Sequence, residues 1–444
     1  MQYSLNKIAE ITNGKLIGQS DLLVTSIDFD SRNINAGAIF VPIKAERDGH
    51  DFIQAAADNG AIVSFVERQV DVDIPQIIVK DTQRAFWDLA KDYLNQVDPT
   101  RVAISGSNGK TTTKDLVSAV LGSQYLIHHT IGSFNNELGV PKTILEMPED
   151  TQIIVLEIGM DRPGQLHDLS NLINPDIAIL TMIGEAHIEF FKTRDKIADA
   201  KMEIVDGMDE HGIFLINGDE PLLLERAGFF SGSIFTFGQN PDNSFEVTDI
   251  NPQSNGLFFK VNDSQFHVHM LGRFNALNAA SAIAVGDIFN LSEEEIQTGL
   301  DQLLLTQNRL TILEGSNGQK IISDVYNSNP TAAVEAVKIL NDFQTDGKRY
   351  LVLGDMLELG ELSIEQHQRL IEPINNSNID EVYLIGSIFP QISSQLTKNV
   401  HTYQKAELQK LSADLENAVE PNDLMLLKGS HGIHLEKVLA NLID

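Results

Sequence analysis

One short segment carries the residue types that bind the phosphates of a nucleotide. A buried-type strand, residues 102–105, precedes it, and an amphipathic helix is expected from about residue 110 to residue 121. A strand, a glycine turn and a helix start direct backbone N–H groups and the helix dipole at an anion. We therefore predict an ATP-binding loop that reads Gly106-Ser107-Asn108-Gly109-Lys110-Thr111-Thr112.

Each position in this loop has an expected task. Gly106 and Gly109 permit the tight backbone, Lys110 would reach the β- and γ-phosphates, and the Thr111 hydroxyl would bind Mg²⁺. The usual pattern has a further glycine where this chain has Ile104, so the loop is one step shorter at its start. The alternative is a chance Gly-Lys-Thr at a helix N-terminus, which the flanking strand and helix disfavour.

Three residues of metal-binding type lie farther along the chain. Glu157 ends the strand that follows the loop, His187 comes just after the strand ending at Thr181, and Lys201 lies in a helical stretch. Strand C-termini collect at the ligand crevice of a doubly wound sheet, so Glu157 and His187 are candidates to hold Mg²⁺ near the phosphates. With each taken singly, spacing alone favours the simpler alternatives, which are a surface carboxylate, a loop histidine and an exposed lysine.

Two helix starts offer further polar side chains. The turn from Asp324 to Pro330 joins a strand to a helix, and Pro330 suits the first helical position. It is compatible with a simple capped turn. Asn275 and Asn278 lie three apart at another helix start, where capping is favoured for one and a ligand contact is open to the other.

The order of the predicted elements favours an α/β protein, because short apolar runs alternate with amphipathic stretches. We predict a small α/β domain over residues 1–98 and a central, doubly wound, mostly parallel ATP-binding domain over 99–312. The central domain is expected to contain an antiparallel insert at about 234–270. A Rossmann-like α/β domain is predicted over 313–444.

Composition limits the function classes. The chain has 444 residues, a formal net charge of −31 and no cysteine. This acidity disfavours nucleic-acid partners, and no apolar segment is long enough for membrane insertion. The N-terminus lacks the pattern of a secretory signal. We therefore expect a cytoplasmic enzyme that acts as a monomer on small molecules.

Several segments together resemble the Mur ligases, ATP-dependent enzymes that extend the peptidoglycan stem peptide. The shortened phosphate loop is similar to theirs, and other similar segments occur in each of the three predicted domains. These segments are Phe29-Asp30-Ser31-Arg32, residues 37–42 and 48–52, Asn135-Asn136-Glu137-Leu138-Gly139-Val140-Pro141, Tyr326-Asn327-Ser328-Asn329-Pro330, residues 353–360, and Lys428-Gly429-Ser430.

The resemblance implies a reaction and its cofactors. The implied enzyme ligates D-alanyl-D-alanine to UDP-N-acetylmuramoyl-tripeptide through an acyl phosphate, using ATP and Mg²⁺. It implies that Lys201 is carbamylated by CO₂, and that Glu157 and His187 hold Mg²⁺. With Lys110 these residues form the implied catalytic set.

The resemblance also implies binding roles for other residues. Asn278 would lie near the adenine, and Arg309 and Asp324 would close on the nucleotide. Ser31 and Arg32 would contact the uridine nucleotide. The remaining implied substrate-binding residues are Asn135, Asn136 and Asn329.

Departures from the family pattern occur at four positions: Ser133, Phe274, Asn308 and Ser328. They bear on the adenine and tripeptide contacts rather than on the reaction class. Two other functions stay open at this point. One is a related ATP-dependent amino-acid ligase such as a folylpolyglutamate synthase, and the other is a non-catalytic sensor of cell-wall precursors.

Overall fold

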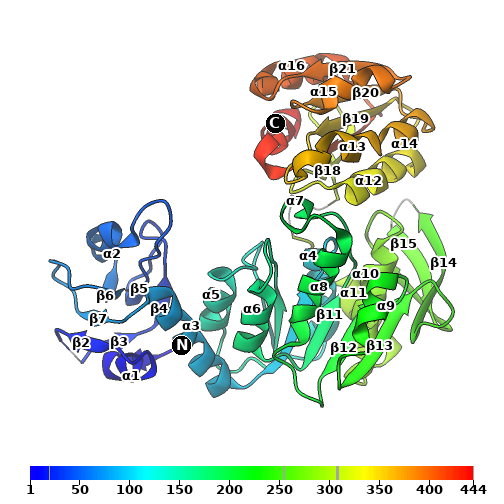
Figure 1. Ribbon diagram of the computed structural model, residues 1–444. Coiled ribbons are helices and arrows are strands. Elements are labelled where there is room, and N and C mark those ends of the chain that lie inside the picture. Colours follow the sequence, from blue (N-terminus) through cyan, green and yellow to red (C-terminus); the bar gives the residue numbers. More distant parts are fainter. Residues whose placement is uncertain (20, 254–255, 307–309, 444) are drawn as a thin grey trace.

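The computed structural model describes residues 1–19, 21–253, 256–306 and 310–443. Within these ranges the strands form three large sheets, one in each expected domain, and a small pair of β1 (Tyr3–Ser4) with β3 (Leu23–Val24). This confirms the predicted α/β class with three parts (Figure 1). None of the helices in the described ranges is long and apolar enough to cross a bilayer.

Among the described residues, the N-terminal sheet has five strands, of which only the β2–β7 pair is antiparallel. In spatial order they are β2 (Lys15–Ile17), β7 (Gln76–Ile78), β6 (Ala61–Val66), β5 (Ala38–Phe40) and β4 (Ser26–Asp28). The accompanying helices are α1 (Leu5–Ile11), α2 (Ile53–Asp58) and α3 (Thr82–Val97). The amphipathic helix α3 leads directly to the central sheet and packs against α5 (Gly139–Glu146) of the next domain.

The central sheet has nine strands and carries the predicted phosphate loop. In spatial order these are β16 (Ser264–Val268), β15 (Gly256–Val261), β14 (Phe245–Gln253), β13 (Ser233–Gly238), β12 (Ile213–Asn217), β11 (Ile177–Leu180), β8 (Thr100–Ser105), β10 (Ile153–Glu157) and β9 (Ile127–His129). The sheet is parallel from β9 to β14, and β14, β15 and β16 pair antiparallel. The expected antiparallel insert is therefore an extension of this sheet, because β13 pairs in parallel with both β12 and β14.

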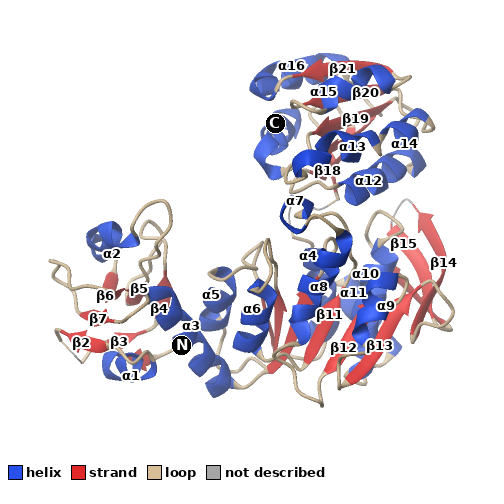
Figure 2. Cartoon of the chain, in the orientation of Figure 1, coloured by secondary structure: helices blue, strands red, loops and turns tan. Residues whose placement is uncertain are grey.

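Helices cover both faces of the central sheet (Figure 2). Alternate residues of β8 show why: Val102 and Ile104 pack with α4 and α10, whereas Ala103 belongs to the core that includes α5 and α6. Side chains two apart on a strand share a face, so a strand buried on both faces reads as a continuous apolar run. The central helices are α4 (Lys110–Gly122), α5, α6 (Gln165–Ile173), α7 (Ile188–Phe191), α8 (Arg194–Met202), α9 (Pro221–Ala227), α10 (Asn275–Ile288) and α11 (Glu293–Asp301).

In the part of the chain that the structure describes, the C-terminal sheet has six strands, of which only the β17–β18 pair is antiparallel. They are β17 (Thr311–Glu314), β18 (Lys320–Asp324), β22 (Leu424–Lys428), β19 (Arg349–Gly354), β20 (Glu381–Ile385) and β21 (Asn399–Tyr403). The expected limit between residues 312 and 313 falls within β17. The helices are α12 (Pro330–Asp342), α13 (Ser363–Gln368), α14 (Ile371–Asn375), α15 (Phe389–Ile392), α16 (Leu408–Ala418) and α17 (Leu435–Ile443).

Candidate active site

A cavity of about 720 Å³ lies between the central and C-terminal domains. One wall is the predicted phosphate loop, residues 107–112, and the other includes Asp324, Asn329 and Lys428. The predicted residues that line the same cavity are Asn135, Asn136, Glu157, His187 and Asn278. The structure thus brings together most of the predicted site residues, which come from distant parts of the sequence.

The phosphate loop has the backbone that its glycines predict. Gly106 and Gly109 both have positive φ, at 149° and 83°. A Cβ at Gly106 would lie 1.8 Å from Thr181 Oγ1, and one at Gly109 would lie 2.6 Å from Asn278 Oδ1. Gly109 is the N-cap residue of α4 and has no side chain that could cap the helix. Its first N–H groups therefore form a binding site for an anion.

Lys110 begins α4 as predicted. Its Nζ donates a hydrogen bond to the carbonyl oxygen of Gly106 at 3.0 Å, so the side chain folds back along the loop. This places an ammonium group beside the N–H groups that face the cavity. A cation there offsets the charge of a phosphate chain.

Glu157, the last residue of β10, is buried with 1% of its surface exposed. The alternative of a surface carboxylate is therefore wrong. Its Oε1 accepts a hydrogen bond from Asn135 Nδ2 at 2.7 Å, whereas its buried Oε2 has no hydrogen-bond partner among the described residues. An orphaned carboxylate oxygen in a cavity with a phosphate loop suits a hard cation such as Mg²⁺.

Lys201 is also buried, near the end of α8, which rules out the alternative of an exposed lysine. Burial disfavours the ammonium form and sets the pKa of Lys201 well below its ordinary value, and Lys110 nearby lowers it further. Burial therefore shifts the side chain toward the neutral amine, the nucleophilic form of a lysine.

His187 turns toward the C-terminal domain. It has a positive φ of 62° at the start of α7, and its Nδ1 lies 2.7 Å from Glu358 Oε2. The Nδ1 is within ion-pair distance but lies outside hydrogen-bonding geometry. The His187 ring lowers the pKa of Glu358, against the opposing effect of burial. In this conformation the predicted Mg²⁺ ligand thus joins two domains.

The two asparagines at the start of α10 do not cap it, so the capping prediction was wrong. Phe274 is the N-cap residue and makes no side-chain capping bond. Asn275 Nδ2 donates to the Leu271 carbonyl at 2.7 Å, and Asn278 Nδ2 donates to Asn275 Oδ1 at 2.7 Å. The pair instead forms a buried amide chain beside Gly109, at the cavity wall.

Asn135 and Asn136 line the cavity in different ways. Asn135 holds Glu157 through the hydrogen bond described above. Asn136 Oδ1 accepts hydrogen bonds from the backbone N–H groups of Leu138 and Gly139, at 3.1 and 2.9 Å. Asn136 therefore shapes the turn that leads into α5, while Asn135 fixes a candidate metal ligand.

The turn before α12 contributes the C-terminal wall. Asn329 caps α12 by accepting a hydrogen bond from Ala332 N–H at 3.0 Å, and Pro330 follows at the helix start as predicted. The amides of Asn329 and Asn108 also exchange two hydrogen bonds, at 2.5 and 3.2 Å. Asp324 accepts a hydrogen bond from buried Lys428 at 2.5 Å.

A second bridge between the central and C-terminal domains was not predicted from the sequence. Glu185 Oε1 accepts a hydrogen bond from Arg369 at 2.7 Å, and its Oε2 accepts one from Thr331 at 2.7 Å. Burial acts to raise the pKa of Glu185, but these two partners outweigh it and the pKa is lowered. The position of Glu185 just after a buried strand was the available signal, but nothing local identifies its partners.

The structure does not bring every predicted residue to the cavity. Ser31 and Arg32 lie in the N-terminal domain, where Arg32 is largely exposed and pairs with Asp30 at 2.7 Å. Gly106 and Lys201 are buried and do not line the cavity. Arg309 lies outside the described residues.

Comparisons with known proteins give one consistent result. Residues 104–286 match the family model of the Mur ligase middle domain, and residues 308–431 match that of the Mur ligase, glutamate ligase domain. The UDP-N-acetylmuramoyl-tripeptide–D-alanyl-D-alanine ligase of Bacillus subtilis (strain 168) is 37% identical over 456 residues, which cover 99% of this chain and 98% of the relative.

Solved structures agree over the full length. The MurF crystal structure from Acinetobacter baumannii has a TM-score of 0.89 and 27% identity, and the match covers 100% of this chain and 99% of the other. The MurF ligase from Thermotoga maritima, solved in complex with ADP, has a TM-score of 0.83 and 30% identity, with coverage of 94% and 97%. The similarity thus extends through all three domains.

Proposed function

This chain belongs to the Mur ligase family of ATP-dependent ligases, and we propose that it joins D-alanyl-D-alanine to the carboxylate of UDP-N-acetylmuramoyl-tripeptide. The observation that carries the proposal is the shared cavity, in which the phosphate loop faces the turn from Asp324 to Asn329. An activated carboxylate formed on one wall is thereby within reach of an amine held by the other.

The reaction follows from the chemistry of a carboxylate, which is a poor acylating group. The carboxylate oxygen attacks the γ-phosphorus of ATP, the bond to the β-phosphate oxygen breaks, and ADP leaves. The dipeptide amine then attacks the acyl phosphate carbon, and the tetrahedral intermediate collapses to an amide and phosphate. Lys110 and the N–H groups of the loop hold the phosphates in place and offset their charge.

Mg²⁺ fits the residues beside this loop. Glu157 and the Thr111 hydroxyl would hold it, since the Glu157 Oε2 is buried without a hydrogen bond among the described residues. When bound, the ion stabilises negative charge on the transferring phosphoryl group. His187 is a further candidate, provided that its ring leaves Glu358.

We also propose that Lys201 carries a carbamate. Its low pKa supports this, because the neutral amine attacks CO₂, a C–N bond forms and one proton is released. With ¹³C-labelled bicarbonate, the wild type should give a carbamate carbon signal in NMR that Lys201→Arg lacks. An identical spectrum from both proteins would overturn this assignment.

The domain limits at 98 and 312, a uridine site near Ser31 and Arg32, a monomeric state and a cytoplasmic location remain predictions. The N-terminal site has one supporting feature. Lys142 of α5 contacts Asp28 Oδ2 at 2.5 Å and lies over the Phe29 ring at 5.4 Å, so the central domain supports the segment that carries Ser31 and Arg32.

Phosphate release provides the test of the proposed reaction. It should require ATP, the UDP-linked tripeptide and D-alanyl-D-alanine together, and mass spectrometry should find the pentapeptide product. Release that instead depends on a folate and glutamate would favour the related amino-acid ligase. Nucleotide binding without any product would favour the non-catalytic sensor, and either result would overturn the proposal.

A further inference from the structure

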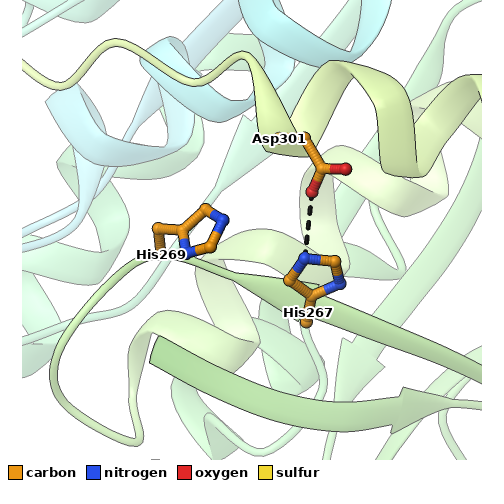
Figure 3. A group of neighbouring side chains, drawn as sticks. All are labelled: His267, His269 and Asp301. Atoms are coloured by element: carbon orange, nitrogen blue, oxygen red, sulfur yellow. Dashed lines mark ion pairs between the residues drawn. The ribbon is translucent and has the colours of Figure 1, made fainter. Parts of the chain in front are cut away.

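We propose a second metal site, for a transition-metal ion of the Zn²⁺ class, at the outer edge of the central sheet. Its ligands are His267, His269 and Asp301, whose ligand atoms all lie within 4.8 Å of one another (Figure 3). None of the three lines the cavity that holds the phosphate loop. The site is therefore separate from the proposed ligase chemistry and from its Mg²⁺.

The fold explains why these three residues meet. β16 is the last strand of the sheet, and His267 lies within it. His269 follows two positions later, and strand side chains two apart point to the same side. Asp301 is the last residue of α11, which packs beside β16. The two imidazoles therefore lie at the end of a strand, and the carboxylate lies at the end of a helix that packs beside it.

Neighbouring side chains hold the ligands in position. Gln297, one turn before Asp301, exchanges two hydrogen bonds of 3.0 Å with the backbone of His267. Its Nε2 also donates to Asp301 Oδ1 at 2.7 Å. The His267 ring stacks on Phe258, with ring centroids 5.4 Å apart. Such supporting contacts orient ligands and reduce the freedom lost when a metal binds.

The separation of the first two ligands fits a shared ion. His267 Nε2 lies 3.1 Å from Asp301 Oδ1. Two ligands that are each about 2.0–2.1 Å from Zn²⁺ lie roughly 2.9–3.4 Å apart at octahedral to tetrahedral angles. The exposed His269 would supply the third ligand, since its ring nitrogen lies within 4.8 Å of the other two ligand atoms, and water would complete the coordination.

The donor set selects the ion. Two imidazole nitrogens and one carboxylate suit Zn²⁺, Ni²⁺ or Cu²⁺, whereas Mg²⁺ and Ca²⁺ prefer oxygen ligands. The side chains of His267 and Asp301 are 32% and 46% exposed, so an ion has direct access from solvent. A bound ion would tie β16 to the end of α11 and stabilise the folded chain through binding.

Zinc titration of the full-length protein tests the site, with excess Mg²⁺ and ADP present to occupy the ligase cavity. The wild type should bind one more zinc ion than His269→Ala does at the same free zinc concentration. Loss of one ligand should weaken this binding by at least about tenfold, since even supporting contacts are worth that much. Asp301→Asn should behave like His269→Ala.

His211→Ala is the matched control, because His211 is an exposed histidine elsewhere in the central domain. It should bind zinc as the wild type does. Zinc should raise the melting temperature of the wild type and of His211→Ala but not of His269→Ala, and all three proteins should ligate at the same rate without zinc. Equal zinc affinity and equal thermal shifts in the wild type and His269→Ala would overturn the proposal.

Discussion

The central domain meets its two neighbours through junctions of different character. At the N-terminal junction, aromatic side chains of α3 reach into the central domain: Trp87 Nε1 donates to the Glu137 carbonyl at 2.8 Å, and the buried Tyr93 hydroxyl donates to the Met147 carbonyl at 2.7 Å. At the C-terminal junction, the corresponding contacts join polar or charged side chains, as in Glu185 with Arg369 and His187 with Glu358.

The difference indicates at which junction the two domains can move relative to each other. Apolar packing with buried hydrogen bonds favours one fixed arrangement, whereas contacts between polar side chains of two domains can be broken and remade as the domains move. The phosphate loop lies at the polar junction (Figure 1). We therefore expect ATP binding and product release to adjust the C-terminal domain, while the N-terminal domain stays attached through α3.

The largest expected effect comes from the loop at the polar junction. Lys110→Ala should reduce ligation by at least about a hundredfold, because it removes a cation that offsets phosphate charge. Phosphate release under saturating substrates measures this effect. Lys196→Ala, which alters an exposed lysine of α8, is the control and should retain activity. Near-normal turnover in Lys110→Ala would refute the phosphate-loop assignment.

Breaking the bridge between the domains should have the next largest effect. Glu185→Gln removes the charge that pairs with Arg369, and poorer domain alignment should lower kcat/KM by up to about a hundredfold. Small-angle X-ray scattering should show a larger radius of gyration than in the wild type. If both kcat/KM and the radius stay unchanged, the polar contacts do not hold this junction.

The same bridge predicts a pH dependence. The pKa of Glu185 is lowered in the folded chain, so its stabilising contribution is complete above the unfolded-state pKa and is lost as pH falls through the lowered folded value. The junction should therefore weaken below about pH 4.3. Scattering across this range should show expansion in the wild type and a smaller change in Glu185→Gln. Equal expansion in the two proteins would assign the effect to other carboxylates.

The smallest effect on activity is expected at the N-terminal junction. Tyr93→Phe leaves the buried Met147 carbonyl without its partner, so the free energy of unfolding should fall by about 1–3 kcal/mol. Ligation should continue at nearly the wild-type rate, because α3 packing keeps the domains together. Urea unfolding and phosphate release measure the two quantities. A large loss of activity would mean that this junction also moves during turnover.

Local sequence predicts the phosphate loop well, because strand, glycine turn and helix start are adjacent in the chain. The helix begins at Lys110 as expected, and the glycines have the backbone angles that their type permits. The bridge from Glu185 to Arg369 could not be predicted from local sequence, since these residues are 184 positions apart. Neither Asn275 nor Asn278 caps α10 as predicted, because the Asn275 Oδ1, an atom that could cap, instead accepts a hydrogen bond from Asn278 Nδ2.

Gln297 has a consequence beyond the ligands that it orients. β16 ends the central sheet, and an edge strand exposes backbone groups that can pair with a strand of another molecule. At His267 the side-chain amide of Gln297 already occupies both the N–H and the carbonyl group. The amide thus takes the place of a neighbouring strand at one residue and removes one unpaired position at which another molecule could add to this edge.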